Sequence, residues 1–372
     1  MANRTADAIV VGAGPIGLET AANLAAAGLD CLVLEAGCVG RTIADWPPMT
    51  PFFSSPERCA VAGVPVQDGH QSMLTGEEYL AYLRQVVEIR DIPVRTYAPV
   101  SSVRRDGAGG FVLTAGPEGA EDEYRCRYLV LATGNMGRPR RLGVPGEDLP
   151  NVAHRFAGPH RYFRRRLLVV GGRNSAVEAA IRCWRSGAEV AVSYRGPRFE
   201  KKKLNSRYHL EIGILVKKGK IGFLPETTVR EIRRDGAVLD SPRGEAFHPC
   251  DDVLVQAGFV PDLSLMEMAG VGLEGDERLP RLNPATMETD VPGLFLAGTA
   301  SGGGQIAYRI FVATSHHHGA AITRRITGKE AAWAGSLPAR AYPFDNDDLA
   351  PTEGGQDEPS SPAEPLPRSV SG

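Results

Sequence analysis

The chain has 372 residues, of which 42% are apolar and 23% charged, and its formal net charge is −2. These values are typical of a globular protein of about two domains and argue against a global basic field for a nucleic-acid partner. We expect no signal peptide, because a strand at 8–11 follows the N-terminus directly, and no membrane span, because no apolar run approaches about 20 residues.

The first quarter of the chain predicts a strand, a glycine loop, a helix and a second strand. The strands fall at 8–11 and 31–35, with the helix at 16–27 between them. A loop-rich, proline-containing stretch follows at 40–66, and then an amphipathic helix at about 76–90. This order is typical of the opening half of a dinucleotide-binding unit.

The rest of the chain predicts a meander and then a second opening of the same kind. Short alternating runs at 94–132 are divided by turn residues and close with a strand at 128–134. The second strand–glycine loop–helix opening spans 166–178, its helix runs to about residue 185, and its partner strand lies at 189–195. The later elements are strands at 252–259 and 294–298 and a last helix at about 305–327.

The first glycine loop, residues 12–17, reads G-A-G-P-I-G. Gly12 permits a tight turn, Gly14 lets the backbone approach a pyrophosphate, and Gly17 allows the helix to pack closely on the strand. Glu35 ends the next strand, where a carboxylate can hold ribose hydroxyls and would repel a 2′-phosphate. We therefore expect FAD or NAD at this site rather than NADP.

Two distant segments make FAD the better choice. A-T-G at 132–134 and L-F-L-A-G at 294–298 each belong to an apolar strand that runs into glycine. In two-dinucleotide flavoproteins such segments return to the first domain and close over the flavin. The predicted FAD contacts are Gly12, Gly14, Pro15, Ile16, Gly17, Glu35, Thr133, Gly134 and Gly298.

The second glycine loop, G-G-R-N-S-A at 171–176, predicts a second dinucleotide site. Its partner strand ends with Arg195 instead of a carboxylate, and Arg198 follows. Because arginines accept a 2′-phosphate, we expect NADPH in preference to NADH. The predicted contacts are Gly171, Gly172, Arg173, Asn174, Ser175, Ala176, Arg195 and Arg198.

These patterns predict an α/β protein with two Rossmann-like, three-layer dinucleotide-binding domains. The FAD domain is expected to be discontinuous, 1–150 and 250–330, with the NAD(P)H domain at 151–249 inserted. Residues 345–372 are mainly acidic residues, proline, serine and glycine, which predicts a disordered tail. The six cysteines form no C-x-x-C pair, and this thiol usage favours the cytoplasm.

Several segments resemble those of a known family: F-F-S-S at 52–55, A-T-G-N-M-G at 132–137, H-R-F-A-G-P-H-R-Y-F at 154–163 and G-G-R-N-S-A at 171–176. The order of motifs resembles the low-molecular-weight thioredoxin reductase superfamily, and these segments are most similar to the bacillithiol disulfide reductases. The resemblance implies that NADPH reduces FAD and that the flavin reduces a low-molecular-weight thiol disulfide such as bacillithiol disulfide, or a small redox protein. It also implies an oligomer of identical chains.

The chain departs from these families at the redox centre. Thioredoxin reductases carry C-x-x-C shortly before the second nucleotide strand, but 154–163 contains no cysteine. The bacillithiol-type family usually has a cysteine at the position of Ile16. The remaining catalytic candidates are Cys38, in the loop after Glu35, and His318, where the resembled family also carries histidine. No metal site is expected, since consecutive histidines at 316–318 on a helix point about 100° apart.

Three other functions stay open. A ferredoxin- or flavodoxin-NADP reductase needs no protein thiol and is compatible with Ile16. A flavin monooxygenase shares the G-G-x-N-S-A motif, although the spacing from Phe156 to His160 is one residue shorter than in such enzymes. A non-catalytic flavin-binding sensor is a further alternative, because a family member that lost the loop cysteine could have lost turnover and kept the flavin.

Overall fold

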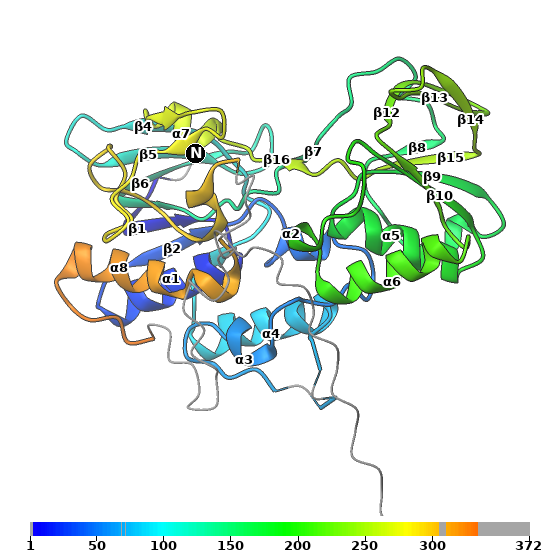
Figure 1. The fold of residues 1–372 in the computed structure, drawn as a ribbon. Coiled ribbons are helices and arrows are strands. Elements are labelled where there is room, and N and C mark those ends of the chain that lie inside the picture. Colours follow the sequence, from blue (N-terminus) through cyan, green and yellow to red (C-terminus); the bar gives the residue numbers. More distant parts are fainter. Residues whose placement is uncertain (1–2, 68, 71, 305–309, 334–372) are drawn as a thin grey trace, which may run out of the picture. The chain divides into compact units, whose positions relative to one another are not determined.

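The computed structural model describes residues 3–67, 69–70, 72–304 and 310–333. The tail predicted at 345–372 lies outside the described residues. Two sheets of mainly parallel strands, each with helices on one face, make up the described part (Figure 1). The α/β class expected from the sequence is confirmed, whereas the domain boundaries near 150 and 250 stay a prediction.

The first sheet has seven strands in the order β3-β2-β1-β6-β5-β4, and β19 pairs with β6. Its strands are β1 (Asn3–Val11), β2 (Cys31–Leu34), β3 (Val94–Arg95), β4 (Val100–Arg105), β5 (Phe111–Ala115), β6 (Asp122–Leu131) and β19 (Leu294–Leu296). Strands β3, β2, β1, β6 and β19 are parallel, and β4, β5 and β6 form the predicted antiparallel meander. The late strand β19 thus returns to the first sheet, as its sequence predicted.

Helices cover the first sheet on one face. They are α1 (Pro15–Ala26), α4 (Gly76–Ile89) and α8 (His316–Thr327). Alternate residues of β1 face opposite sides of the sheet. Ala8 and Val10 pack against these helices. Ile9 and Val11 pack on the other face, with residues of the β4–β6 meander and of the short helix α7 (Ser264–Met268). None of these four residues is more than 6% exposed, so β1 is a central strand buried on both faces. Figure 1 shows α1 and α8 side by side.

The second sheet has five parallel strands in the order β11-β10-β9-β15-β8. They are β8 (Val152–Ala153), β9 (Arg166–Val170), β10 (Glu189–Tyr194), β11 (Gly222–Pro225) and β15 (Asp252–Val255). Helices α5 (Asn174–Arg185) and α6 (Ser206–Lys217) cover one face (Figure 1). An antiparallel sheet covers the other, formed by β12 (Thr228–Arg233), β13 (Gly236–Asp240) and β14 (Ala246–Pro249).

Short elements complete the described chain. They are α2 (Arg41–Ala44), α3 (Pro56–Cys59), β7 (Arg138–Pro139), β16 (Phe259–Val260), β17 (Leu273–Glu274), β18 (Leu279–Pro280), η1 (His160–Tyr162), η2 (Lys201–Lys203), η3 (Gly298–Gly302) and η4 (Val312–Thr314). Strands β7 and β16 pair antiparallel in the connections that join the two sheets. Helix α4 begins at a capping box between Thr75 and Glu78, which fixes the predicted boundary.

Two predicted elements are wrong in extent. The strand at 252–259 ends at Val255, because Gly258 takes a left-handed conformation with φ +93° and breaks the extended run. The last helix begins at His316, well after the predicted 305; residues 305–309 lie outside the described part. The hydroxyl groups of Thr314 and Ser315 both donate to the Phe311 carbonyl, which favours the turn η4 over a longer helix.

Candidate functional site

The first glycine loop has the backbone geometry of a dinucleotide-binding turn. Gly12 has φ +111°, and a Cβ there would lie 2.5 Å from the Ala132 carbonyl oxygen. A Cβ on Gly17 would lie 2.0 Å from the Gly12 carbonyl oxygen, so α1 packs too closely on the loop for any side chain. By contrast, a Cβ on Gly14 would have no atom within 4 Å. Gly14 is therefore the place where a phosphate can approach the backbone at the start of α1.

Glu35 lies where the sequence predicted it, at the end of β2 and beside this loop. Its Oε2 accepts a hydrogen bond from the Ala13 amide at 2.7 Å, and its Oε1 accepts one from the Gly37 amide at 2.8 Å. The residue is 7% exposed. The hydrogen bonds from these two backbone amides hold the carboxylate in one orientation and leave oxygen lone pairs for the hydroxyls of a ribose.

The predicted flavin segments converge on this loop from three parts of the chain. Ala132 donates its amide to the Val11 carbonyl at 2.8 Å, which places Thr133 and Gly134 beside the loop. Gly298 follows β19 with φ +66°, and a Cβ there would lie 3.2 Å from the Cβ of Ile16. A Cβ on Gly134 would lie 3.7 Å from the Thr299 hydroxyl oxygen. The structure thus brings the three glycine-containing segments together.

No cysteine takes the place of the missing loop thiol. Ile16 is 5% exposed and fills that position with an aliphatic side chain against Gly298. Burial raises the pKa of the thiols of Cys31, Cys59, Cys126 and Cys183 to about 12 and that of Cys250 to about 11. Such thiols carry almost no thiolate at neutral pH. Cys38 is half-buried and follows Glu35 by three residues.

His318 contacts the flavin segments through the backbone. Its Nδ1 accepts a hydrogen bond from the Gly298 amide at 3.0 Å, so the neutral ring carries its proton on Nε2. Burial, together with the charges of His317 and His316, lowers the pKa of His318 to about 3. The ring is therefore neutral at physiological pH, and it holds Gly298 in place as an acceptor.

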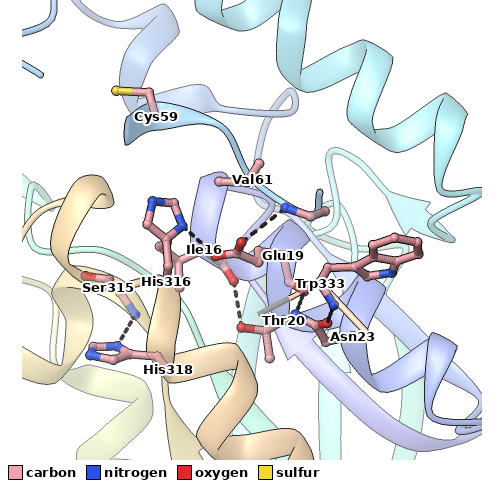
Figure 2. A network of polar contacts seen from close by, with 12 residues as sticks. Ile16, Glu19, Thr20, Asn23, Cys59, Val61, Ser315, His316, His318 and Trp333 are labelled. Atoms are coloured by element: carbon pink, nitrogen blue, oxygen red, sulfur yellow. Dashed lines mark hydrogen bonds and ion pairs between the residues drawn. The ribbon is translucent and has the colours of Figure 1, made fainter. Parts of the chain in front are cut away.

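The sequence reasoning missed a buried ion pair next to these residues. Glu19 of α1 is 1% exposed and His316 of α8 is 8% exposed. Their Oε2 and Nδ1 atoms lie 2.9 Å apart, as Figure 2 shows. No acidic residue lies near the histidines at 316–318 in the sequence. Their carboxylate partner is Glu19, in a helix near the other end of the chain. A signal was present in the acidic residue on the otherwise apolar face of the first helix.

The second glycine loop is also tightly built. Gly171 has φ +142°, and a Cβ there would lie 2.4 Å from the Gln256 carbonyl oxygen and 3.0 Å from the Ala176 Cβ. A Cβ on Gly172 would lie 2.4 Å from the ring of Tyr194. Helix α5 begins at Asn174, whose Oδ1 accepts a hydrogen bond from the Asn205 amide at 2.8 Å. Asn174 therefore uses its side-chain oxygen to position a neighbouring loop.

The remaining predicted contacts lie at the start of α5 and after the end of β10. Arg173 is the N-cap of α5 and is half-buried, and Ser175 is exposed in the first turn. Arg195 and Arg198 follow β10 and are exposed. Within the described part of the chain, neither guanidinium has a carboxylate within 4.0 Å. That these two side chains bind the 2′-phosphate of NADPH stays a prediction.

Among the described residues, no group of three or more histidine, cysteine or acidic residues is arranged to hold a metal ion. No helix in the described part of the chain has the length and apolar character that a membrane crossing requires.

Comparisons with known proteins agree with this geometry. A family model described as pyridine nucleotide-disulphide oxidoreductase matches residues 9–298. The bacilliredoxin reductase Bdr of Bacillus subtilis is 34% identical over 87% of this chain and 98% of its own length. A ferredoxin–NADP reductase of Ignicoccus hospitalis is 29% identical over 78% of this chain and 89% of its own. The structure of bacillithiol disulfide reductase Bdr from Bacillus cereus superposes with a TM-score of 0.84 at 31% identity, covering 88% of this chain and 100% of that one.

Proposed function

Because this chain belongs to the pyridine nucleotide-disulphide oxidoreductase family, we propose that it is an FAD-dependent, NADPH-oxidising reductase of a low-molecular-weight thiol disulfide. The overall reaction would convert one disulfide, NADPH and a proton to two thiols and NADP⁺. The proposal is supported by the presence of two glycine loops of dinucleotide-binding geometry in a chain that is similar to two Bdr proteins.

The first site fits FAD. The open backbone at Gly14 would face the pyrophosphate, and Glu35 would hold the adenosine ribose. Ile16, Gly134 and Gly298 would lie against the flavin half, because Gly298 meets Ile16 and Gly134 meets Thr299, the residue after Gly298. When bound, the flavin accepts a hydride from a reduced nicotinamide and passes two electrons on. The residues themselves bind, orient and exclude water.

The second site fits NADPH. The start of α5 would receive the pyrophosphate, with Arg173 and Ser175 beside it. Arg195 and Arg198 would pair with the 2′-phosphate, since no acidic side chain within the described residues neutralises them. A carboxylate at the end of β10 would instead have favoured NADH.

Electron transfer to the disulfide is proposed to need no protein thiol. Five cysteines are buried with a raised pKa, and Cys38 follows Glu35 by three residues. The disulfide would then meet the flavin directly. The cytoplasmic location and the oligomer of identical chains stay predictions.

A second candidate acceptor is ferredoxin. The burial of five of the six cysteines and the likeness to a ferredoxin–NADP reductase both favour it. A one-electron carrier protein requires only an accessible flavin edge.

Anaerobic reduction of the purified protein tests the proposal. NADPH should bleach the flavin absorbance band quickly and NADH slowly, and bacillithiol disulfide should then reoxidise the flavin. Reoxidation by ferredoxin alone would select the second candidate. A protein that contains no flavin, or a flavin that neither nucleotide reduces, would overturn both.

A further inference from the structure

The first turn of α8 is joined to α1 by a closed series of contacts. His316 bonds Glu19 of α1, and His318, two residues later, accepts the amide of Gly298 (Figure 2). Gly298 lies against Ile16, which opens α1 in the first glycine loop. The contacts therefore start on α1, cross to α8, and return to the beginning of α1 where the flavin half is proposed to bind.

Both carboxylate oxygens of Glu19 and both ring nitrogens of His316 have a hydrogen-bond partner. Glu19 Oε1 accepts from the Ala62 amide at 3.1 Å, and Oε2 lies 2.9 Å from His316 Nδ1. His316 Nε2 lies 2.9 Å from the carbonyl oxygen of Arg58 in α3. Three segments, α1, α3 with its following loop, and α8, meet at this one pair (Figure 2).

The geometry fixes the number of protons that the pair holds. The Arg58 carbonyl can only accept, so His316 Nε2 must carry a proton. The contact between Nδ1 and Oε2 needs one more proton, whichever of the two atoms carries it. Loss of that proton would leave a buried carboxylate facing a ring lone pair, which is repulsive and costly at this depth.

Other ionisable groups also face the pair. Burial alone lowers the pKa of His316, but the hydrogen bond to Glu19 and its charge outweigh burial and leave the pKa raised above 6.5. The groups around it are Arg58 and Cys59 of α3, Tyr79, Tyr82 and Arg90 of and after α4, and His317 and His318 of α8. Of these, Arg58 and His317 oppose a second positive charge, and Glu19 is the acidic side chain in hydrogen-bond contact.

We propose that Glu19 and His316 form a positioning pair for the flavin: they seat the first turn of α8 on α1, and through His318 and Gly298 they set how tightly the flavin is held. The inference rests on the proposed function, because it assigns the flavin to the loop at Gly12–Gly17. Neither residue contacts the cofactor; both act through Gly298.

The pair makes flavin retention depend on pH in a defined direction. A histidine whose folded pKa is raised gives stabilisation that is fully present below the unfolded value of about 6.5 and is lost as the pH rises through the folded pKa. The FAD dissociation constant of the wild-type protein should therefore rise with pH, by at most about tenfold per pH unit, since one proton is involved.

The variant Glu19→Gln should reverse this direction. Its amide nitrogen can donate to Nδ1, its oxygen can accept from Ala62, and Nε2 can still donate to Arg58. This neutral network is complete at alkaline pH and is broken when acid protonates the ring. FAD should thus be held better, not worse, as the pH rises.

The variant His316→Gln leaves Glu19 as a buried charge without a cation, so FAD should be lost most easily. The double variant Glu19→Gln/His316→Gln removes the charge and should restore retention with little pH dependence. His317→Gln is the matched control, because it makes the same substitution at an exposed neighbour on α8 and leaves the hydrogen bond between Glu19 and His316 in place. Its pH slope should keep the direction of the wild type.

In the experiment, each holoprotein is heated at a series of pH values between about 5.5 and about 9.5, the range in which the pair should titrate. Released FAD is followed by its fluorescence and helix content by circular dichroism. Opposite pH slopes for the wild type and Glu19→Gln, with release before loss of helix, support the proposal. Equal slopes, no rescue in the double variant, or release that coincides with helix loss in every protein would overturn it. A protein without flavin would overturn the proposed function itself, and the inference with it.

Discussion

Ile16 and Gly298 lie in direct contact, with a distance of 3.2 Å from the Ile16 Cβ to the position that a Cβ on Gly298 would occupy. One residue opens the first helix and the other follows the last strand of the sheet. The contact closes the proposed flavin site between the two ends of the fold. It also explains why position 298 favours glycine, since the backbone there has φ +66° and a Cβ would be accommodated only if Ile16 shifted.

Gly298→Ala should weaken FAD binding. The new methyl group would press on Ile16 and require a left-handed backbone, at a cost of about 1–2 kcal/mol from the backbone alone. The flavin-to-protein ratio after purification and the FAD dissociation constant measure the effect. Gly143→Ala is the control, because Gly143 has φ +73° but open space around its Cβ position. Equal loss of FAD in the two variants would show that backbone strain, and not contact with Ile16, is responsible.

Arg195→Gln should weaken NADPH binding by about tenfold or more and leave NADH binding nearly unchanged, because only NADPH carries the 2′-phosphate. Dissociation constants for both nucleotides, measured with the oxidised protein, give the ratio. Lys217→Gln removes an equal charge at an exposed position on α6 and controls for a general electrostatic effect. A parallel weakening of both nucleotides by Arg195→Gln would contradict the assignment.

Cys38→Ser should leave disulfide reduction within about twofold of the wild type, since the proposed reaction uses no protein thiol. Flavin reduction by NADPH is measured in the same samples to show that the cofactor sites are intact. If reduction of the flavin persists but turnover with bacillithiol disulfide is abolished, Cys38 is the nucleophile and direct transfer from the flavin is wrong.

His318 should make the protein sensitive to acid. Its pKa is lowered to about 3 in the fold by burial and by the neighbouring histidines. A group with a depressed folded pKa binds more protons when unfolded, so its contribution is full above about pH 6.5 and declines towards pH 3 as the pH falls. His318→Asn keeps an acceptor for the Gly298 amide but cannot titrate, and its unfolding temperature should fall less between these limits. An unchanged acid slope would assign the sensitivity to other groups.

The local motifs were readable because they are short and their geometry is set by neighbours in sequence. The run at 8–11 predicted a strand, and Gly12, Gly17 and Glu35 take the turn, the close packing and the strand end expected of them. The T-x-x-E sequence at Thr75 fixed the start of α4 through its own capping box. The start of the last helix was not readable in this way, because it depends on hydrogen bonds from the Thr314 and Ser315 hydroxyls that helix propensity does not predict.

Sequence alone determined that two strand–glycine loop–helix openings exist and that arginines follow the second, because these features depend on spacing along the chain. Only the tertiary structure decided that Glu19 pairs with His316, that His318 holds Gly298, and that Ile16 packs against Gly298. The contacts of Glu19 with His316 and of Ile16 with Gly298 join residues from opposite ends of the chain. A buried charge selects its partner by proximity in space and by the cost of being left unpaired, and the distance between two helices is set by how the whole sheet packs.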